Sequence, residues 1–210
     1  MPEIKPRYNI DTLEQLTGLF GTVSEASAKK EVSFIHPHYQ AMIAASPFAV
    51  LATSGANGLD VSPRGDAPGF VVVHDQQTLL LPERRGNNRV DSLRNLLSDP
   101  RISLLFLIPG VGETLRVKGR ARISIDPELM EQFAVAGKQP QCVLVISVET
   151  VFFQCARAVK RSGLWGQQRA NPARADVPTA GAILSTLTRG EIDGEKYDAG
   201  LAARQKATLY

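Results

Sequence analysis

The sequence has no apolar run approaching the roughly 18 residues that a membrane-spanning helix needs. Its first residues, MPEIKPRYNIDTLEQL, lack the basic-then-apolar pattern of a secretion signal. It has only two cysteines, Cys142 and Cys155, and they form neither a CxxC pair nor a secreted disulfide framework. We therefore expect a cytoplasmic protein without membrane contact, in which both thiols are buried and reduced.

Familiar catalytic motifs are also missing. There is no GxGxxG after a strand, no GxSxG, no Walker loop and no paired-carboxylate arrangement, so hydrolase chemistry and a doubly wound fold are disfavoured. His36 and His38 flank a proline, and His74 falls in an expected turn, so no third ligand stands at metal spacing. We expect no metal site.

Charge is nearly balanced along the 210 residues, with 24 Lys and Arg against 21 Asp and Glu, a formal excess of +3. The basic residues gather at 84–94, 116–122 and 157–169, which favours local anion sites over one continuous stripe. The basic segment 116–122 has no interleaved aromatic residues on which bases could stack, so no nucleic-acid partner is expected. With 43% hydrophobic residues, the chain can bury one substantial core.

Residues 1–40 read as an N-terminal helical appendage. Asp11 is positioned to cap a helix that carries Leu13, Leu16 and Leu19–Phe20, with Glu14 as a capping-box partner and Gly18 or Gly21 at its end. A second helix is predicted over 37–45, beginning at Pro37 and ending before Ser46–Pro47.

Short strands dominate the middle of the chain. FAVLATS (48–54), the turn GANG (55–58) and LDVS (59–62) give a strong hairpin signal. In 113–124, Leu115, Val117 and Ala121 alternate with basic residues, so one face is predicted to be core. Further strands are predicted at 70–73, 78–81, 102–108 and 142–153, the last as a buried pair or one long bent strand, and helices at 88–97, 126–137 and 180–189, the last followed by a polar tail.

Many short strands without a βαβ rhythm predict a mainly β protein of the α+β class, a closed or partly closed antiparallel β-barrel with helices packed outside it. We divide the chain into the appendage (1–40), the barrel domain (41–165) and a C-terminal loop, helix and tail (166–210) that packs on the same domain.

The segment 59–97 brings Arg64, Arg84, Arg85 and Arg89 into one supersecondary unit. A helix beginning near Asn88 would add backbone N–H groups and a positive dipole end. Planar cations and free amides are what a phosphate monoester requires. The alternative is that these arginines are only a solvated face.

The segments SPFAVLAT (46–53), DVSPRGD (60–66), PERRGNNRVDSLRNLL (82–97), FLIPGVGETLRVKGRARI (106–123) and VFFQCARAVKRSGLW (151–165) together resemble the pyridoxamine 5′-phosphate oxidase-like family. The match is nearest to a branch described only as FMN-dependent enzymes, and it covers roughly residues 35–205. This resemblance implies a split β-barrel that binds FMN in a groove between two subunits.

The resemblance also implies the site residues. The first candidates are the phosphate and ribityl contacts of the PERRGNNR segment, and Ser62, Arg64 and Gly65 of the neighbouring hairpin come second. The resemblance further implies that the RSGLW segment reaches the cofactor region, either in its own chain or from the partner chain of a dimer. The candidates in PERRGNNR are Arg84, Arg85, Asn87, Asn88 and Arg89. Those in RSGLW are Arg161, Ser162 and Trp165.

Simpler roles remain open for some of these residues. Asn87 could only cap the helix, Asp66 could only hold its turn, and Trp165 could belong to a dimer core. Relatives read closer to HCxKA and RSRLW, whereas this chain has Gln154–Ala158 (QCARA) and RSGLW. The missing histidine and the arginine at 157 leave no general acid or base assigned.

The function expected from the resemblance is an FMN-dependent oxidoreductase acting on an unidentified small molecule. Alternatives are a flavin-binding carrier, sensor or stress-linked protein without turnover, or a barrel that uses a deazaflavin or haem. FMN is expected rather than FAD because no Rossmann fingerprint is present. A C2 homodimer is expected because the apolar segments 102–108 and 142–153 exceed what one small barrel buries.

Overall fold

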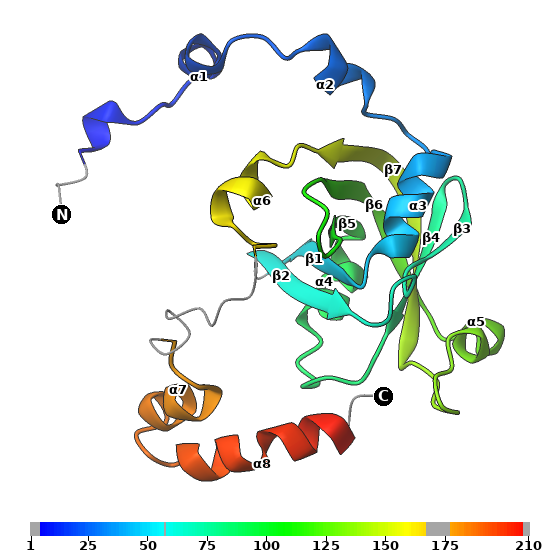
Figure 1. Cartoon of the computed structure of the whole chain (residues 1–210), viewed down its shortest axis with the longest axis vertical. Coiled ribbons are helices and arrows are strands. Elements are labelled where there is room, and N and C mark those ends of the chain that lie inside the picture. Colours follow the sequence, from blue (N-terminus) through cyan, green and yellow to red (C-terminus); the bar gives the residue numbers. More distant parts are fainter. Residues whose placement is uncertain (1–4, 57, 167–176, 208–210) are drawn as a thin grey trace.

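The computed structural model describes residues 5–56, 58–166 and 177–207. Its centre is a seven-stranded antiparallel sheet in the order β2-β1-β5-β6-β7-β4-β3, with helices around it (Figure 1). The strands are β1 (Phe48–Gly55), β2 (Gly58–Gly65), β3 (Val72–Asp75), β4 (Thr78–Glu83), β5 (Arg101–Leu107), β6 (Thr114–Ser124) and β7 (Cys142–Gln154). The predicted α+β class with an antiparallel sheet is confirmed.

Alternation along the strands builds the core. In β6, Leu115, Val117 and Ala121 are buried while Lys118 and Arg120 are exposed, as the sequence pattern predicts. The segment 142–153 is one long strand, β7, whose residues 142–146 are all buried. One face of this stretch meets the main core, and the other meets a smaller cluster containing Phe133, which follows α5.

A bulge bends β7 against β6. Lys118 pairs with Thr150 and the next residue, Gly119, pairs with Val148, so Glu149 is left over on the longer strand. A Cβ atom at position 119 would overlap the carbonyl group of Ser147. Glycine is therefore required where the two strands approach each other most closely.

The described ranges also contain helices. They are α1 (Leu13–Phe20), α2 (Glu25–Lys29), α3 (Pro37–Ala45), α4 (Asp91–Ser98), α5 (Pro127–Gln132), α6 (Arg157–Ser162), α7 (Ala180–Leu187) and α8 (Gly194–Ala207), with a short 3-10 helix η1 (Pro6–Tyr8). The predicted bounds of α3 are confirmed. None of the helices in the described ranges is both long and apolar enough to cross a membrane.

The predicted cap of α1 is wrong by one residue. The Thr12 hydroxyl accepts a hydrogen bond from the Gln15 backbone, and the Gln15 side chain accepts from the Thr12 backbone in return. This reciprocal pair is a complete capping box, which displaces Asp11 from the cap position. The helix ends at Gly21, one of the two glycines predicted to end it.

The predicted start of α4 near Asn88 is also wrong, because the helix begins at Asp91. The side chain of Asn87 accepts a hydrogen bond from the Arg89 backbone at 3.1 Å, which holds a turn in place of the first helical residues. Asn88 and Val90 both have positive φ, 60° and 52°, a conformation that interrupts a right-handed helix. Residues 84–90 therefore form a loop that leads into α4.

Two other helix bounds differ from the prediction. The helix predicted over 126–137 ends at Gln132, since Phe133 is already non-helical. The predicted polar tail contains α8, which packs against α7. Docking of this helical pair on the barrel domain stays a prediction, and residues 167–176 and 208–210 lie outside the described ranges.

The N-terminal arm, defined here as residues 5–24, extends away from the sheet (Figure 1). The chain becomes attached only after it, where Val32 pairs with Val151 and the Tyr39 hydroxyl donates to the Lys30 carbonyl at 2.7 Å. No residue of α1 or α2 is buried. The arm and α2 thus contribute nothing to the core of their own chain.

The prediction that both cysteines are buried is wrong for one of them. Cys142 is buried in β7, but Cys155 follows the end of that strand and is exposed. Burial, together with the nearby Glu83 carboxylate, raises the pKa of Cys142 to about 11. The backbone N–H of Arg157 donates to the Cys155 thiol and lowers its pKa.

We expect iodoacetamide to alkylate Cys155 in the native protein well before Cys142, because the thiolate is the reactive species and only Cys155 is accessible. Mass spectrometry of tryptic peptides over time measures the two rates. Denatured protein, in which both thiols react, serves as the control. Equal rates in the native protein would contradict the placement of Cys155.

Candidate functional site

A polar cavity of about 740 Å³ lies between β2, the end of β4, the 84–90 loop and the start of α4. Eight of the eleven predicted cofactor-binding residues line it, although they come from two separate segments of the chain. They are Ser62, Arg64, Gly65, Arg84, Arg85, Asn87, Asn88 and Arg89. The cavity also takes in Asp60, Glu83 and Ser92, three polar residues that the sequence analysis did not select.

The side chains of β2 alternate between this cavity and the outside. Asp60, Ser62 and Arg64 line the cavity, whereas Leu59 and Val61 on the opposite face are exposed. Pairing with β1 fixes this orientation, since Ser62 lies opposite Leu51, whose side chain is fully buried. The hairpin therefore presents three polar groups at spacing i, i+2, i+4.

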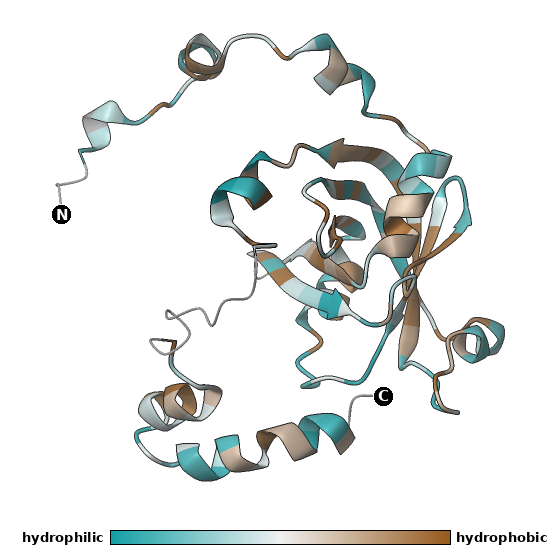
Figure 2. Cartoon of the chain, viewed as in Figure 1, coloured by the Kyte–Doolittle hydropathy of each residue, from teal (hydrophilic) through white to brown (hydrophobic). Residues whose placement is uncertain are grey.

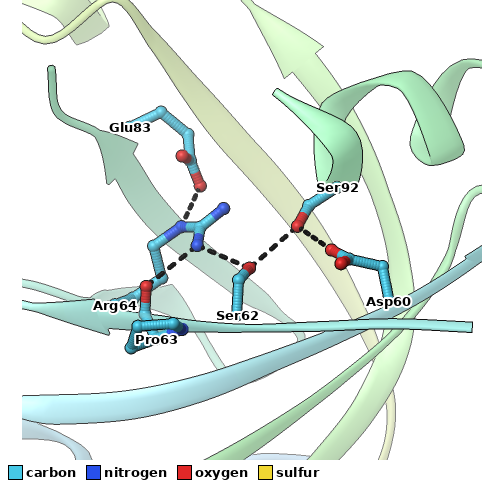
Figure 3. A network of polar contacts seen from close by, with 6 residues as sticks. All are labelled: Asp60, Ser62, Pro63, Arg64, Glu83 and Ser92. Atoms are coloured by element: carbon cyan, nitrogen blue, oxygen red, sulfur yellow. Dashed lines mark hydrogen bonds and ion pairs between the residues drawn. The ribbon is translucent and has the colours of Figure 1, made fainter. Parts of the chain in front are cut away.

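Arg64 is the centre of a polar network (Figure 3). Its Nε donates to Glu83 Oε1 at 2.7 Å, and its Nη1 donates to Ser62 Oγ at 2.8 Å. The Ser62 hydroxyl lies 2.9 Å from that of Ser92, which in turn donates to Asp60 Oδ2 at 2.6 Å. The network joins β2, β4 and α4 and fixes the orientation of the Arg64 guanidinium.

The Arg64–Glu83 ion pair is largely buried, with side-chain exposures of 17% and 10%. Its partners stand 19 residues apart in the sequence, at the ends of two different strands. Among the residues that the structure describes, Nη2 of Arg64 has no hydrogen-bond partner. One edge of an oriented cation thus remains available to a ligand.

Arg84 is held in a similar way. Its Nε lies 3.2 Å from Asp66 Oδ2, and its Nη1 donates to the Phe133 carbonyl at 2.7 Å. Both charged side chains are mostly buried, at 16% and 8% exposure. Asp66 accepts from the Ala67 backbone within its turn and also from Arg84, so it does more than hold the turn.

Arg85 and Arg89 are the more accessible cations of the cluster. Arg89 pairs with Asp91 at 2.9 Å but stays 75% exposed, and this hydrogen bond raises its pKa. Arg85 lines the cavity and makes no ion pair with any residue in the described ranges. The interpretation of the cluster as a solvated face is therefore wrong for Arg64 and Arg84. Only Arg85 and Arg89 are accessible enough to belong to such a face.

Formal charges around the cavity balance. Its lining contains four arginines, at 64, 84, 85 and 89, and four carboxylates, at 60, 66, 83 and 91. Three of the arginines are paired with carboxylates of this lining, and the Asp60 carboxylate accepts from Ser92. An incoming anion would therefore rely on Arg85 and on the outer edges of the paired guanidinium groups.

The RSGLW residues lie elsewhere in the chain. Arg161 and Ser162 belong to α6, where the Ser162 hydroxyl donates to the Val159 carbonyl at 3.0 Å. Trp165 Nε1 donates to the Val111 carbonyl at 2.6 Å. None of the three lines the cavity of its own chain, so their contribution from a partner chain stays a prediction.

Three members of the network, Asp60, Glu83 and Ser92, were not predicted from the sequence. Asp60 and Ser62 stand two residues apart on a strand, so the alternation that placed Ser62 in the site also places Asp60 there. No sequence signal pointed to Glu83 or Ser92, because their partners are set by the tertiary fold.

Comparison with known proteins identifies the family. The family model described as Pyridoxamine 5′-phosphate oxidase matches residues 35–155, more than half of the chain, and the protein belongs to this family. The split β-barrel fold expected for its members is thereby confirmed. A search of curated proteins gives no match.

Solved structures resemble a little more than half of the chain. HupZ of Group A Streptococcus is 19% identical with a TM-score of 0.48, and the match covers 58% of this chain and 94% of that one. General Stress Protein 26 of Bacillus anthracis is 18% identical with a TM-score of 0.41, over 54% and 88%. An FAD-binding protein of Mesorhizobium loti is 16% identical with a TM-score of 0.39, over 54% and 87%.

Proposed function

We propose that the protein binds FMN in the cavity beside β2 and is an FMN-dependent oxidoreductase acting on a small molecule. Arg85 carries this proposal: it is a cation on the cavity wall, and it has no carboxylate partner among the described residues. An anion is attracted by such an uncompensated charge, and a planar guanidinium suits a phosphate.

Neighbouring groups fit the same ligand. Arg89 and the side-chain amides of Asn87 and Asn88 lie on the same loop and line the same cavity. Together they would bind the phosphate, while the oriented edge of Arg64 and the Ser62 hydroxyl would meet polar atoms farther along the cofactor. FMN rather than FAD is proposed because no dinucleotide fingerprint precedes a helix.

A bound flavin would itself carry hydride or electron transfer, so the chain needs only to place the cofactor and exclude water. The network around Arg64 keeps its orientation through four hydrogen-bonded side chains. We propose that two copies form a C2 dimer around this site and that Arg161, Ser162 and Trp165 reach the cofactor from the partner.

The purified protein is expected to be yellow and to release FMN on heating, as identified by mass. Anaerobic NAD(P)H should bleach the flavin absorbance near neutral pH, and air should restore it. A protein that carries no flavin, or FAD at equal occupancy, would contradict the cofactor assignment. Free FMN treated in the same way is the control for non-enzymatic reduction.

A flavin-binding role without turnover, as a carrier, sensor or stress-linked protein, is supported by one observation. Every carboxylate on the cavity wall is already engaged, three by arginines and Asp60 by Ser92. None is left as a general base in the described part of the cavity. Flavin that is bound but never bleached by a reductant would favour this role over catalysis.

A further inference from the structure

The N-terminal arm exposes an unusual amount of apolar surface. Seven large apolar side chains lie between residues 8 and 23, and four of them, Leu13, Leu16, Leu19 and Phe20, belong to α1 at 43–79% exposure. Figure 2 shows this helix largely brown although it lies apart from the core. The seven are Tyr8, Ile10, Leu13, Leu16, Leu19, Phe20 and Val23.

This apolar surface is carried by a well-formed helix. The leucines and Phe20 follow the spacing i, i+3, i+6, i+7, so they share one face, and the capping box at Thr12 fixes where the helix starts. An eight-residue helix is marginal by itself in water. Contact with an apolar surface outside the arm would stabilise it.

The barrel carries a second uncovered apolar surface. On the outer face of β2, Leu59 is 86% exposed and Val61 is 65% exposed, directly behind the residues that line the cavity. β2 is also an edge strand of the sheet. Exposed apolar edge strands are normally covered, or blunted by charge or proline, and among the described residues Pro63 blunts this face only at its far end, leaving Leu59 and Val61 uncovered.

We propose that α1 of one protomer packs on the outer face of β2 of a second copy of the chain. The inference rests on the proposed homodimer and goes beyond it, because it assigns the arm a binding surface on the partner. In a C2 dimer each chain supplies one helix and one strand face, so the contact occurs twice.

The apolar area that α1 and β2 can bury suits a contact with a second copy of the chain. Burial of a large apolar side chain removes on the order of 100 Å² from water, so the four on α1 and the two on the outer face of β2 supply roughly 600 Å² per protomer. A stable interface needs about 800 Å² from each partner. One helix and one strand face of each protomer therefore provide most of what a dimer contact requires.

Two other occupants fit less well. Membrane-surface helices carry Lys or Arg on their polar face, whereas the only charged residue of α1 is Glu14. The barrel of the same chain is disfavoured because the arm leads away from it, beyond the attachment at Lys30 and Val32 (Figure 1). A second copy remains the occupant that the structure favours.

The first test measures dimer dissociation by analytical ultracentrifugation on the full chain. Leu16→Asp and Val61→Asp should each raise the dissociation constant at least tenfold. Gly18→Asp is the matched control, since it adds the same charge on the opposite face of α1, where an added side chain meets nothing. Equal dissociation constants for Leu16→Asp and Gly18→Asp would overturn the proposal.

The second test identifies the contact. Phe20 is replaced by the photo-reactive benzoylphenylalanine, and protein labelled with 15N is mixed with unlabelled protein, exchanged and irradiated. Cross-links joining residue 20 to 58–65 in pairs of unlike isotope support the proposal. Pairs of like isotope only, cross-links to another segment, or none at all overturn it. FMN content of the same samples is measured separately, so loss of the arm contact is distinguishable from loss of flavin binding.

Discussion

Replacing Arg85 by alanine is expected to weaken FMN binding by ten- to a hundredfold. The guanidinium lines the cavity without an ion-pair partner in the described structure, so its removal deletes a charge-assisted contact of about 1.5–3 kcal/mol. Lysine at this position should restore part of the affinity, because it keeps the charge but loses the planar fork. Fluorescence titration of apo-protein with FMN measures the effect.

The matched control is Arg94→Ala. Arg94 is an exposed arginine on α4 that does not line the cavity, so its replacement removes the same net charge elsewhere. Arg89→Ala should weaken FMN binding as Arg85→Ala does. The apo-proteins of Arg85→Ala, Arg89→Ala and Arg94→Ala should melt at the same temperature as the parent, since surface substitutions usually change stability by less than about 0.5 kcal/mol. If Arg85→Ala binds FMN as tightly as the parent, Arg85 is only a solvent-exposed charge and does not bind the phosphate.

Replacing Glu83 by alanine is expected to destabilise the fold by about 3 kcal/mol, the largest stability effect among the site residues. The substitution leaves the Arg64 guanidinium without its carboxylate partner in a place where only 17% of its side chain is exposed. An uncompensated charge in such a place costs far more than the pair itself contributes. Urea unfolding of the apo-protein, followed by circular dichroism, measures the loss.

The double variant Arg64→Ala with Glu83→Ala separates charge from packing. Removal of both partners should recover part of the stability that Glu83→Ala loses, since no buried charge then remains unpaired. Arg101→Ala is the control, because it breaks the Arg101–Asp99 pair on the surface, where the arginine side chain is 69% exposed, and should leave the unfolding midpoint unchanged. Equal midpoints for Glu83→Ala and Arg101→Ala would contradict the buried-pair assignment.

These two predictions divide the arginines that the sequence presents as one cluster. Arg84 and Arg85 are neighbours in the chain, yet Arg84 is held by Asp66 and the Phe133 carbonyl, while Arg85 has no carboxylate partner in the described structure. Nothing in the segment PERRGNNR distinguishes them. The difference arises because the tertiary fold brings Asp66 and the Phe133 carbonyl within hydrogen-bond distance of Arg84.

The loop before α4 explains why the sequence predicts a helix start near Asn88, whereas α4 begins at Asp91. Asn87, Asn88 and Arg89 are compatible with a helix N-terminus by composition, and only the positive φ of Asn88 and Val90 delays the helix to Asp91. Such a conformation depends on the surroundings of the loop and not on the residues alone. The dipole of α4 therefore offers less to a phosphate than predicted, since the Asp91 carboxylate already occupies the first turn.

Local sequence patterns determined most elements of the fold. Alternation placed the core face of β6, the Asn-Gly turn placed the β1–β2 hairpin, and Pro37 with Ser46–Pro47 bounded α3. These features depend on residues a few positions apart, whose preferences are set by backbone geometry and water. Together with the family resemblance, they also brought eight residues of the candidate site to notice.

Only the tertiary structure decided which charges meet. Arg64 and Glu83 are 19 residues apart, and Ser62 and Ser92 are 30 apart, so their contacts follow from the packing of β2 beside β4 and α4. The same packing leaves Cys155 exposed, turns Leu59 and Val61 outward and leaves α1 uncovered. The sequence determines which side chains are ionisable and which are apolar. Which of them come into contact depends on how the whole chain packs when it folds.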